Sequence, residues 1–200
     1  MGFLTYLCLK FGAILLRAFA RLQGKITSNP DESPSDLPHP VLINLHGSGF
    51  VIPAHGSDDA FCRQVSQRTG YLVLDIKYRL SPEHPFPAPV DDVEDVVNWV
   101  KSQPNKFDLS RMAISGFSAG GFADLGRFPS NIMIISAGHD SLAPEAERLA
   151  RRLQEDTTRH VVHERMTECD HAWDKTAKKG TKRWELRDKA YKAAIQALLR

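Results

Sequence analysis

The sequence predicts an α/β protein in which helices cover both faces of a mostly parallel sheet, a three-layer α/β/α sandwich. Two observations lead to this fold class: short runs of branched apolar residues recur along the chain, and segments with helical spacing separate most of them. Strands that alternate with helices favour βαβ units, whose crossover helices lie on the faces of a parallel sheet. The expected strands are residues 41–45, 71–76, 111–115, 132–136 and 159–164. The expected helices are residues 58–69, 90–102, 144–155 and about 183–199.

Each element has a local reason. The runs at 41–45 and 132–136 are almost continuously apolar, which is typical of strands buried on both faces. The segment 90–102 carries Asp91, Asp92 and Glu94 in its first turn, where negative charge opposes the positive end of a helix. The segment 144–155 has a charged face of Glu and Arg, which favours a helix with one wet side.

Composition restricts the classes of function. Two hundred residues with 42% hydrophobic content suit one globular domain, and a net charge of +2 without a basic stripe argues against nucleic acid as a partner. The three cysteines, Cys8, Cys62 and Cys169, have neither metal-ligand spacing nor a disulfide pattern. We therefore expect a cytoplasmic protein that uses neither a metal nor a cofactor; its oligomeric state is left open.

The first forty residues are expected to lie outside the main domain. Residues 1–24 have helical spacing, but Lys10, Arg17 and Arg21 interrupt any apolar span of the ~20 residues that a membrane helix needs. We expect an amphipathic helix that packs on the domain or covers the active-site mouth, with peripheral membrane contact as a weaker alternative. Residues 25–40 are expected to form a polar loop, and residues 41–200 the α/β domain.

A nucleophile candidate follows the third expected strand. Gly116-Phe117-Ser118-Ala119-Gly120 is a G-x-S-x-G pentapeptide between a strand and small, helix-compatible residues. Small neighbours allow a serine to sit on a sharp strand-to-helix turn with its hydroxyl exposed. An isolated match of this kind is more often an ordinary turn, so the interpretation needs support from other segments.

Two further segments supply that support. The strand 41–45 runs directly into residues 46–50, His-Gly-Ser-Gly-Phe, whose glycines can present backbone N–H groups to an oxyanion. Asp140 follows the strand at 132–136, and His171 follows the strand at 159–164. The order Ser118, Asp140, His171 is the order in which α/β-hydrolase chains carry their triad.

These segments together resemble a known family. HGSGF at 46–50, YRLSPEHPFPAPVDDV at 78–93, GFSAG at 116–120, AGHDSL at 137–142 and DHAW at 170–173 are similar to motifs of the hormone-sensitive-lipase-like carboxylesterases, the fold-3 α/β hydrolases. The second motif is the most specific of them. The resemblance covers residues from about 40 to 173 and implies a serine carboxylesterase with a lipase-like fold that acts on small-molecule esters.

The resemblance also implies roles for single residues. Ser118 would attack the ester carbonyl, His171 would transfer its proton, and Asp140 would orient the imidazole. Backbone N–H groups of Ser48, Gly49 and Ala119 would form the oxyanion hole, with His46 and Gly47 supporting the loop. Position 48 departs from the usual run of three glycines, and a serine would be strained there if the loop required a positive φ.

The chain also lacks parts that the family has. Residues 121–131 are too few for the crossover that a parallel sheet needs, and the family places a further strand and a substrate-covering cap there. We expect an internal deletion near residues 125–131, with the cap and at least one core strand missing. Two alternatives to an active esterase stay open: a catalytically impaired truncated isoform, and a non-catalytic ligand-binding relative, against which the presence of His171 argues.

Three other side chains compete for roles in the chemistry. Cys169 lies close to His171 in sequence, but it lacks a strand-to-helix turn, and an ordinary buried cysteine is the favoured interpretation. His139 and His163 are interpreted as structural.

Overall fold

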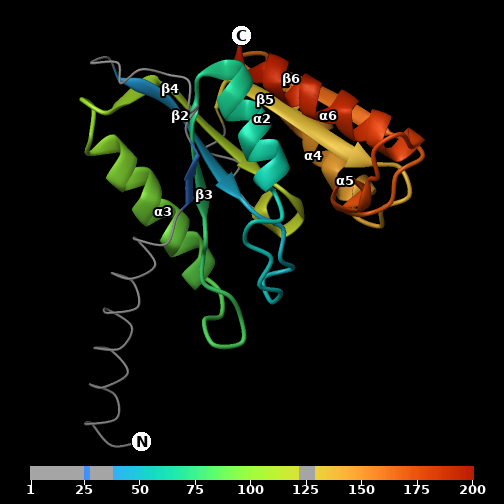
Figure 1. Ribbon diagram of the computed structural model, residues 1–200, viewed down its shortest axis with the longest axis horizontal. Coiled ribbons are helices and arrows are strands. Elements are labelled where there is room, and N and C mark those ends of the chain that lie inside the picture. The colour runs from blue at the N-terminus through green and yellow to red at the C-terminus, as the bar shows by residue number, and fades with distance from the viewer. Residues whose placement is uncertain (1–24, 28–37, 122–128) are drawn as a thin grey trace, which may run out of the picture. The chain divides into compact units, whose positions relative to one another are not determined.

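The computed structural model describes residues 25–27, 38–121 and 129–200, and the chain falls into two compact units, residues 1–121 and 122–200 (Figure 1). Each unit is described by itself. The helix expected at residues 1–24 lies outside the described residues, as does most of the segment 125–131. Within the described residues, no helix has the length and apolar character needed to cross a membrane.

The first unit contains a four-stranded sheet in the order β1-β3-β2-β4. The strands are β1 (Lys25–Thr27), β2 (His39–Leu45), β3 (Leu72–Ile76) and β4 (Phe107–Gly116). β2 runs parallel to both β3 and β4, whereas β1 runs antiparallel to β3. Leu45 pairs with Ile76 on one side and with Gly116 on the other. The loops that follow β2, β3 and β4 therefore begin at the same edge of the sheet.

Helices cover both faces of this sheet. Figure 1 shows α2 (Asp59–Thr69) and α3 (Ala88–Lys101) on opposite sides of the strands. Successive side chains of β2 alternate between the two faces. Val41, Ile43 and Leu45 pack in one buried cluster with Val100 of α3, and the other face of β2 carries Asn44, which bonds to the residue before α2. This arrangement explains why the strand is apolar along nearly its whole length.

The second unit contains a two-stranded parallel sheet, β5 (Asn131–Ala137) and β6 (His160–Met166). Its helices are α4 (Ala143–Gln154), the short α5 (Trp173–Thr176) and α6 (Lys182–Leu198). Ala137 and Met166, at the ends of the strands, pack with Cys169, Trp173 and Ala190 in one buried cluster. Both strand ends are thereby packed against α5 and α6.

The α/β alternation expected from the sequence is present, and most bounds agree within three residues. Three details differ. Lys25–Thr27 form β1 within the segment expected to be a loop, and α5 was not expected. β4 begins four residues early because its pairing with β2 shifts register after Asp108, whose carboxylate accepts hydrogen bonds from Ser110. A local side-chain turn of this kind competes with strand pairing.

β4 lies at an edge of its sheet, and its side chains are more exposed than those of β2. Only residues 117–130 join β4 to β5. This connection has no room for a further strand with its two crossovers, because each parallel crossover needs a dozen or more residues. The fold therefore lacks a core strand and has no cap segment at this position.

Candidate active site

In the first unit, the loop after β2 lies against the turn after β4. The N–H of Phe117 donates a hydrogen bond to the carbonyl of Leu45, with the atoms 3.1 Å apart. A Cβ on Gly47 would lie 3.1 Å from the Phe117 carbonyl oxygen and 3.3 Å from Cβ of Ser118. The glycine loop and the candidate nucleophile are therefore in direct contact.

Ser118 has a backbone conformation that few serines adopt. Its φ is +51°, in the left-handed region, and a short 3₁₀ turn, η1 (Ser118–Gly121), begins at this residue. A non-glycine residue in that region is strained, and such strain concentrates at functional turns. The structure thus places Ser118 on the sharp turn that the pentapeptide predicts.

The glycines on either side of Ser118 allow close approaches. A Cβ on Gly116 would lie 2.1 Å from the carbonyl oxygen of Gly120, and a Cβ on Gly120 would lie 2.2 Å from that of Leu45. These neighbours are backbone atoms, which cannot rotate away as a side chain can. The pentapeptide needs glycine at both ends for this reason.

The loop after β2 uses positive φ values, but not at the position of the serine. Gly49 has φ +55° and Phe50 has φ +63°, whereas Ser48 is not among the positive-φ residues. The strain considered for a serine at position 48 is therefore absent. Within the described residues, the N–H groups of Ser48, Gly49 and Ala119 donate to no protein acceptor.

A tyrosine from the next loop supports the glycine loop. The Tyr78 hydroxyl donates to the His46 carbonyl at 2.5 Å, and the Tyr78 ring stacks on the His46 ring with centroids 4.4 Å apart. The Ser48 hydroxyl lies 2.7 Å from the same tyrosine oxygen. Tyr78 was not recognised as a site residue from the sequence, although it begins the motif at 78–93 on which the family resemblance most depends.

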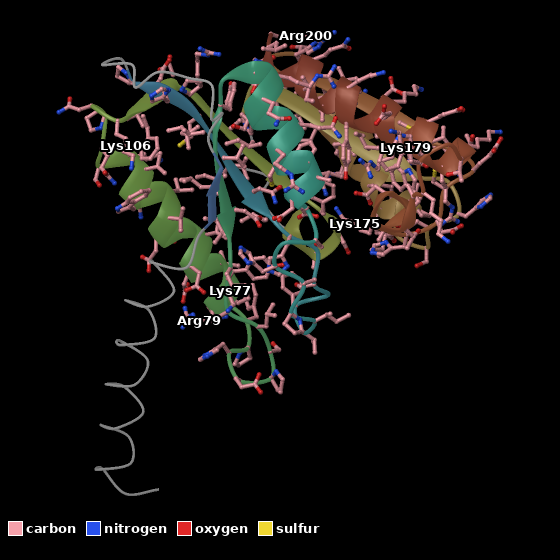
Figure 2. The ribbon with its side chains drawn as sticks, viewed as in Figure 1. Lys77, Arg79, Lys106, Lys175, Lys179 and Arg200 are labelled. Atoms are coloured by element: carbon pink, nitrogen blue, oxygen red, sulfur yellow. The ribbon has the colours of Figure 1, made fainter. Side chains whose placement is uncertain are left out.

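The residue after Tyr78 fixes this second loop to α3. Arg79 donates from its backbone N–H and from its guanidinium to the carboxylate of Asp92, and Figure 2 shows Arg79 beside the first turn of the helix. The hydrogen bond that the Arg79 guanidinium donates to Asp92 is the main cause that raises the pKa of Arg79. Asp92, expected only to oppose the positive helix end, thus also holds the loop that carries Tyr78.

A buried polar group lies at the end of β2 and β3. Asn44 donates to Asp75 at 2.8 Å and to Asp58 at 3.2 Å, and it accepts from Ser115 of β4 at 2.7 Å. Burial raises the pKa of Asp75. One Asp75 oxygen, Oδ2, has no hydrogen-bond partner in the described part of the chain, although Nε2 of His55 lies 3.3 Å from it. This group ties together the three strands that carry the site loops.

In the second unit, Asp140 and His171 form a hydrogen-bonded pair. Nδ1 of His171 lies 2.6 Å from Oδ2 of Asp140, and the other carboxylate oxygen accepts the N–H of Leu142 at 2.9 Å. The His171 side chain is 47% exposed and that of Asp140 is 13% exposed. A largely buried carboxylate thus orients an accessible imidazole.

Backbone contacts bring the two loops of this pair together. The N–H of Gly138 donates to the Met166 carbonyl at 2.8 Å, and that of His139 donates to the Cys169 carbonyl at 2.9 Å. A Cβ on Gly138 would lie 2.3 Å from the Thr167 carbonyl oxygen. Glycine at position 138 therefore lets the loop of Asp140 lie directly on the loop of His171.

The competing side chains have other surroundings. His163 lies 2.9 Å from the Ser136 hydroxyl, and His139 lies 3.9 Å from Asp170. Cys169 is fully buried, and this burial raises the pKa of its thiol, which disfavours a reactive thiolate. No cluster of three or more potential metal ligands occurs in the part of the chain that the structure describes.

Residues 42–122 match the protein family described as alpha/beta hydrolase fold. The chain has the α/β-hydrolase fold. Solved structures share its fold: an esterase of Pyrobaculum calidifontis superposes with a TM-score of 0.71 at 18% identity, over 99% of this chain and 92% of that one. A bacterial heroin esterase gives 0.72 at 18% identity, over 88% and 78%. The three-layer fold and the family resemblance expected from the sequence are confirmed.

The curated relatives of the chain include proteins named as esterases and as other enzymes. Esterase LipI of Mycobacterium tuberculosis is 37% identical over 94 residues, which cover 46% of this chain and 29% of that protein. A tuliposide A-converting enzyme of Tulipa gesneriana is 41% identical over 101 residues, 43% of this chain and 27% of the enzyme. An ethyl acetate hydrolase of Pseudomonas putida is 33% identical over 127 residues, 62% and 36%. The chain thus spans about a third of the length of these relatives.

Proposed function

We propose that this α/β hydrolase is a serine hydrolase of carboxylic esters. The observation that carries the proposal is Ser118, which stands at φ +51° beside a glycine loop in which the N–H groups of Ser48 and Gly49 donate to no described acceptor. A serine held on such a turn beside unoccupied backbone donors is suited to attack a carbonyl and to stabilise the resulting oxyanion.

The first half of the reaction would form an acyl-enzyme. Ser118 Oγ attacks the ester carbonyl carbon while Nε2 of His171 takes the hydroxyl proton, and the carbonyl oxygen becomes an oxyanion bound by the N–H groups of Ser48, Gly49 and Ala119. Asp140 stabilises the imidazolium through Nδ1. The tetrahedral intermediate then collapses, the ester C–O bond breaks, and His171 returns the proton to the departing alcohol.

The second half would release the acid. His171 removes a proton from water, the hydroxide attacks the acyl carbon, and the same N–H groups bind the second oxyanion. Collapse breaks the bond to Ser118 Oγ, which takes back the proton from His171. This mechanism requires Nε2 of His171 to reach Ser118 in the working enzyme. The names of the relatives support an ester as substrate, and one of them is named for ethyl acetate.

A second candidate is a catalytically impaired form of such an esterase. The observation that favours it is the connection of residues 117–130, which joins the element with Ser118 to the element that leads to Asp140 without a crossover strand. In such a form, the Ser118 turn and the Asp140–His171 pair would each keep their chemistry, but they would act together in a smaller fraction of the molecules.

Covalent labelling tests the proposal. A fluorophosphonate probe should label the purified chain, because the activated Ser118 oxygen attacks phosphorus, and Ser118→Ala should abolish the label. Ser110→Ala is a matched control, because Ser110 is an exposed serine on the same strand, β4, that leads to Ser118, and this variant should be labelled like the wild type. Labelling that persists in Ser118→Ala would reject the nucleophile, and no labelling of a folded wild type would reject the enzyme.

A further inference from the structure

A directed chain of hydrogen bonds joins the two ends of the glycine loop. The N–H of Phe50 donates to Ser48 Oγ at 2.9 Å, Ser48 Oγ lies 2.7 Å from Tyr78 Oη, and Tyr78 Oη donates to the His46 carbonyl at 2.5 Å. A phenol has one proton, and here it lies between Tyr78 and His46. The Ser48 hydroxyl must therefore donate to the tyrosine oxygen, and every bond in the chain points from Phe50 toward His46.

Three residues that form this series of hydrogen bonds are shielded from water. Ser48 is 4% exposed, Tyr78 is 2% exposed and His46 is 1% exposed. Hydrogen bonds in such surroundings are stronger than in water and polarise one another, and a buried polar group that loses its partner is costly. Burial also raises the pKa of Tyr78, so the phenol keeps its proton in alkaline solution. The chain of bonds should therefore persist over a wide range of pH.

This chain of bonds determines the backbone path of the loop. His46 and Phe50 are its ends, and between them stands Gly49, whose N–H is one of the proposed oxyanion donors. The Ser48 carbonyl accepts the N–H groups of Val51 and Ile52 at 3.1 and 2.7 Å, and the Phe50 carbonyl accepts the N–H of Ser81 at 2.8 Å. Ser48 is the only residue of the loop whose side chain bonds to both the loop end and the neighbouring tyrosine in the described structure.

We propose that Ser48 is a positioning residue, whose side-chain hydroxyl holds the glycine loop in the shape that aims the Gly49 N–H at the oxyanion. The expected effect of Ser48 on catalysis rests on the proposed ester hydrolysis, whereas its expected effect on the shape of the loop does not. A glycine or an alanine at position 48 keeps the backbone N–H and loses the hydroxyl. The N–H of Phe50 and the oxygen of Tyr78 would then each lose a partner inside the protein.

Kinetics give the first test. Ser48→Ala and Ser48→Gly should lower kcat for a chromogenic short-chain ester about five- to tenfold with little change in KM, because the loss of one net hydrogen bond falls on the transition state. Ser48→Thr keeps a hydroxyl and should retain most of kcat. Ser102→Ala, in an exposed residue at the end of α3, is the matched control and should match the wild type.

A double-mutant cycle tests whether the two hydroxyls act as one unit. Tyr78→Phe keeps the ring that stacks on His46 and removes only the hydroxyl. If the two hydroxyls are links of one chain, Ser48→Ala combined with Tyr78→Phe should lower kcat no further than the worse single variant. Strictly multiplicative losses would mean that the two hydroxyls act separately and would overturn the proposal.

Amide hydrogen exchange gives a test that needs no activity. In the wild type the Phe50 amide should exchange slowly, and Ser48→Ala should speed its exchange about tenfold, well beyond any change in the exchange of the β2 amides. Equal exchange in both proteins would overturn the positioning role, whatever the kinetics. If exchange changes as expected but the wild type neither hydrolyses esters nor reacts with a fluorophosphonate, the loop assignment stands and the proposed function fails.

Discussion

Asp140 uses both of its carboxylate oxygens, one for Nδ1 of His171 and one for the N–H of Leu142. The backbone bond fixes the carboxylate, and the carboxylate in turn fixes the plane and tautomer of the imidazole. In the proposed mechanism, proton transfer to and from the substrate therefore falls to Nε2. At the scale of single residues, catalysis should therefore depend far more on His171 than on the other histidines of the second unit.

His171→Ala should lower ester turnover by about 10³-fold or more, the usual cost of removing a general base from a triad. His163→Ala is the matched control, since His163 bonds to Ser136, and it should keep the activity. Near-normal turnover in His171→Ala would transfer the role to another residue.

Asp75 predicts a pH dependence of stability with a definite sign. Burial raises its pKa above the ordinary 3.8, so between that value and the folded value the native protein holds a proton that the unfolded chain has released. Stability must therefore fall as pH rises through this window. Asp75→Asn, which never ionises, should be about 1–2 kcal/mol more stable than the wild type at pH 7.

Denaturant unfolding measures both proteins across the pH range. The difference between Asp75→Asn and the wild type should shrink toward zero as the pH falls below 3.8, where Asp75 becomes protonated in the unfolded as well as the folded state. A stabilisation that is constant with pH would show that packing, rather than the charge of Asp75, is responsible.

At the scale of elements, the site depends on how closely η1 and β2 approach each other. A Cβ on Gly120 would lie 2.2 Å from the Leu45 carbonyl oxygen and 2.8 Å from that of His46, whereas a Cβ on Gly121 would lie 3.9 Å from its nearest neighbour. The same substitution at these two adjacent glycines therefore adds the same methyl group to very different surroundings, so each variant serves as the control for the other.

Gly120→Ala should push η1 away from β2, lower the free energy of unfolding by about 2–4 kcal/mol as overpacking does, and abolish labelling of Ser118. Gly121→Ala should change both by little, because its added methyl meets ordinary van der Waals contact. Thermal melts and fluorophosphonate labelling measure the two effects. Equal behaviour of the two variants would mean that the close approach does not exist in solution.

The sequence predicted the elements that local pattern determines. Strands such as residues 41–45 and 132–136 are recognisable because burial on both faces makes them continuously apolar, and the turn at Ser118 follows from its glycines. The bond from Ser48 to Tyr78 joins residues thirty positions apart through a side-chain geometry that no local spacing encodes. β1 has three residues, too few for a periodic pattern to indicate a strand.

At the scale of the whole molecule, the described sheets have open edges. β4 ends the four-stranded sheet, and its Ile114 is 56% exposed although it stands in a parallel strand. Among the described strands, β5 pairs with β6 alone. Unpaired strand edges with apolar side chains are templates for association, and parallel strands are normally covered on both faces. The missing core strand thus leaves surface that the fold would ordinarily bury.

The last prediction follows from this surface. At about 25 cal/mol per Å², exposing a few hundred Å² of apolar surface costs several kcal/mol, comparable with the 5–15 kcal/mol by which domains are stable. The purified chain should therefore bind a hydrophobic dye, associate in size-exclusion chromatography and turn over esters far more slowly than a full-length relative. Ile114→Lys should reduce the association, because an edge lysine opposes strand pairing. A monomer that melts cooperatively above ordinary mesophile temperatures and hydrolyses esters as fast as a full-length relative would refute this prediction.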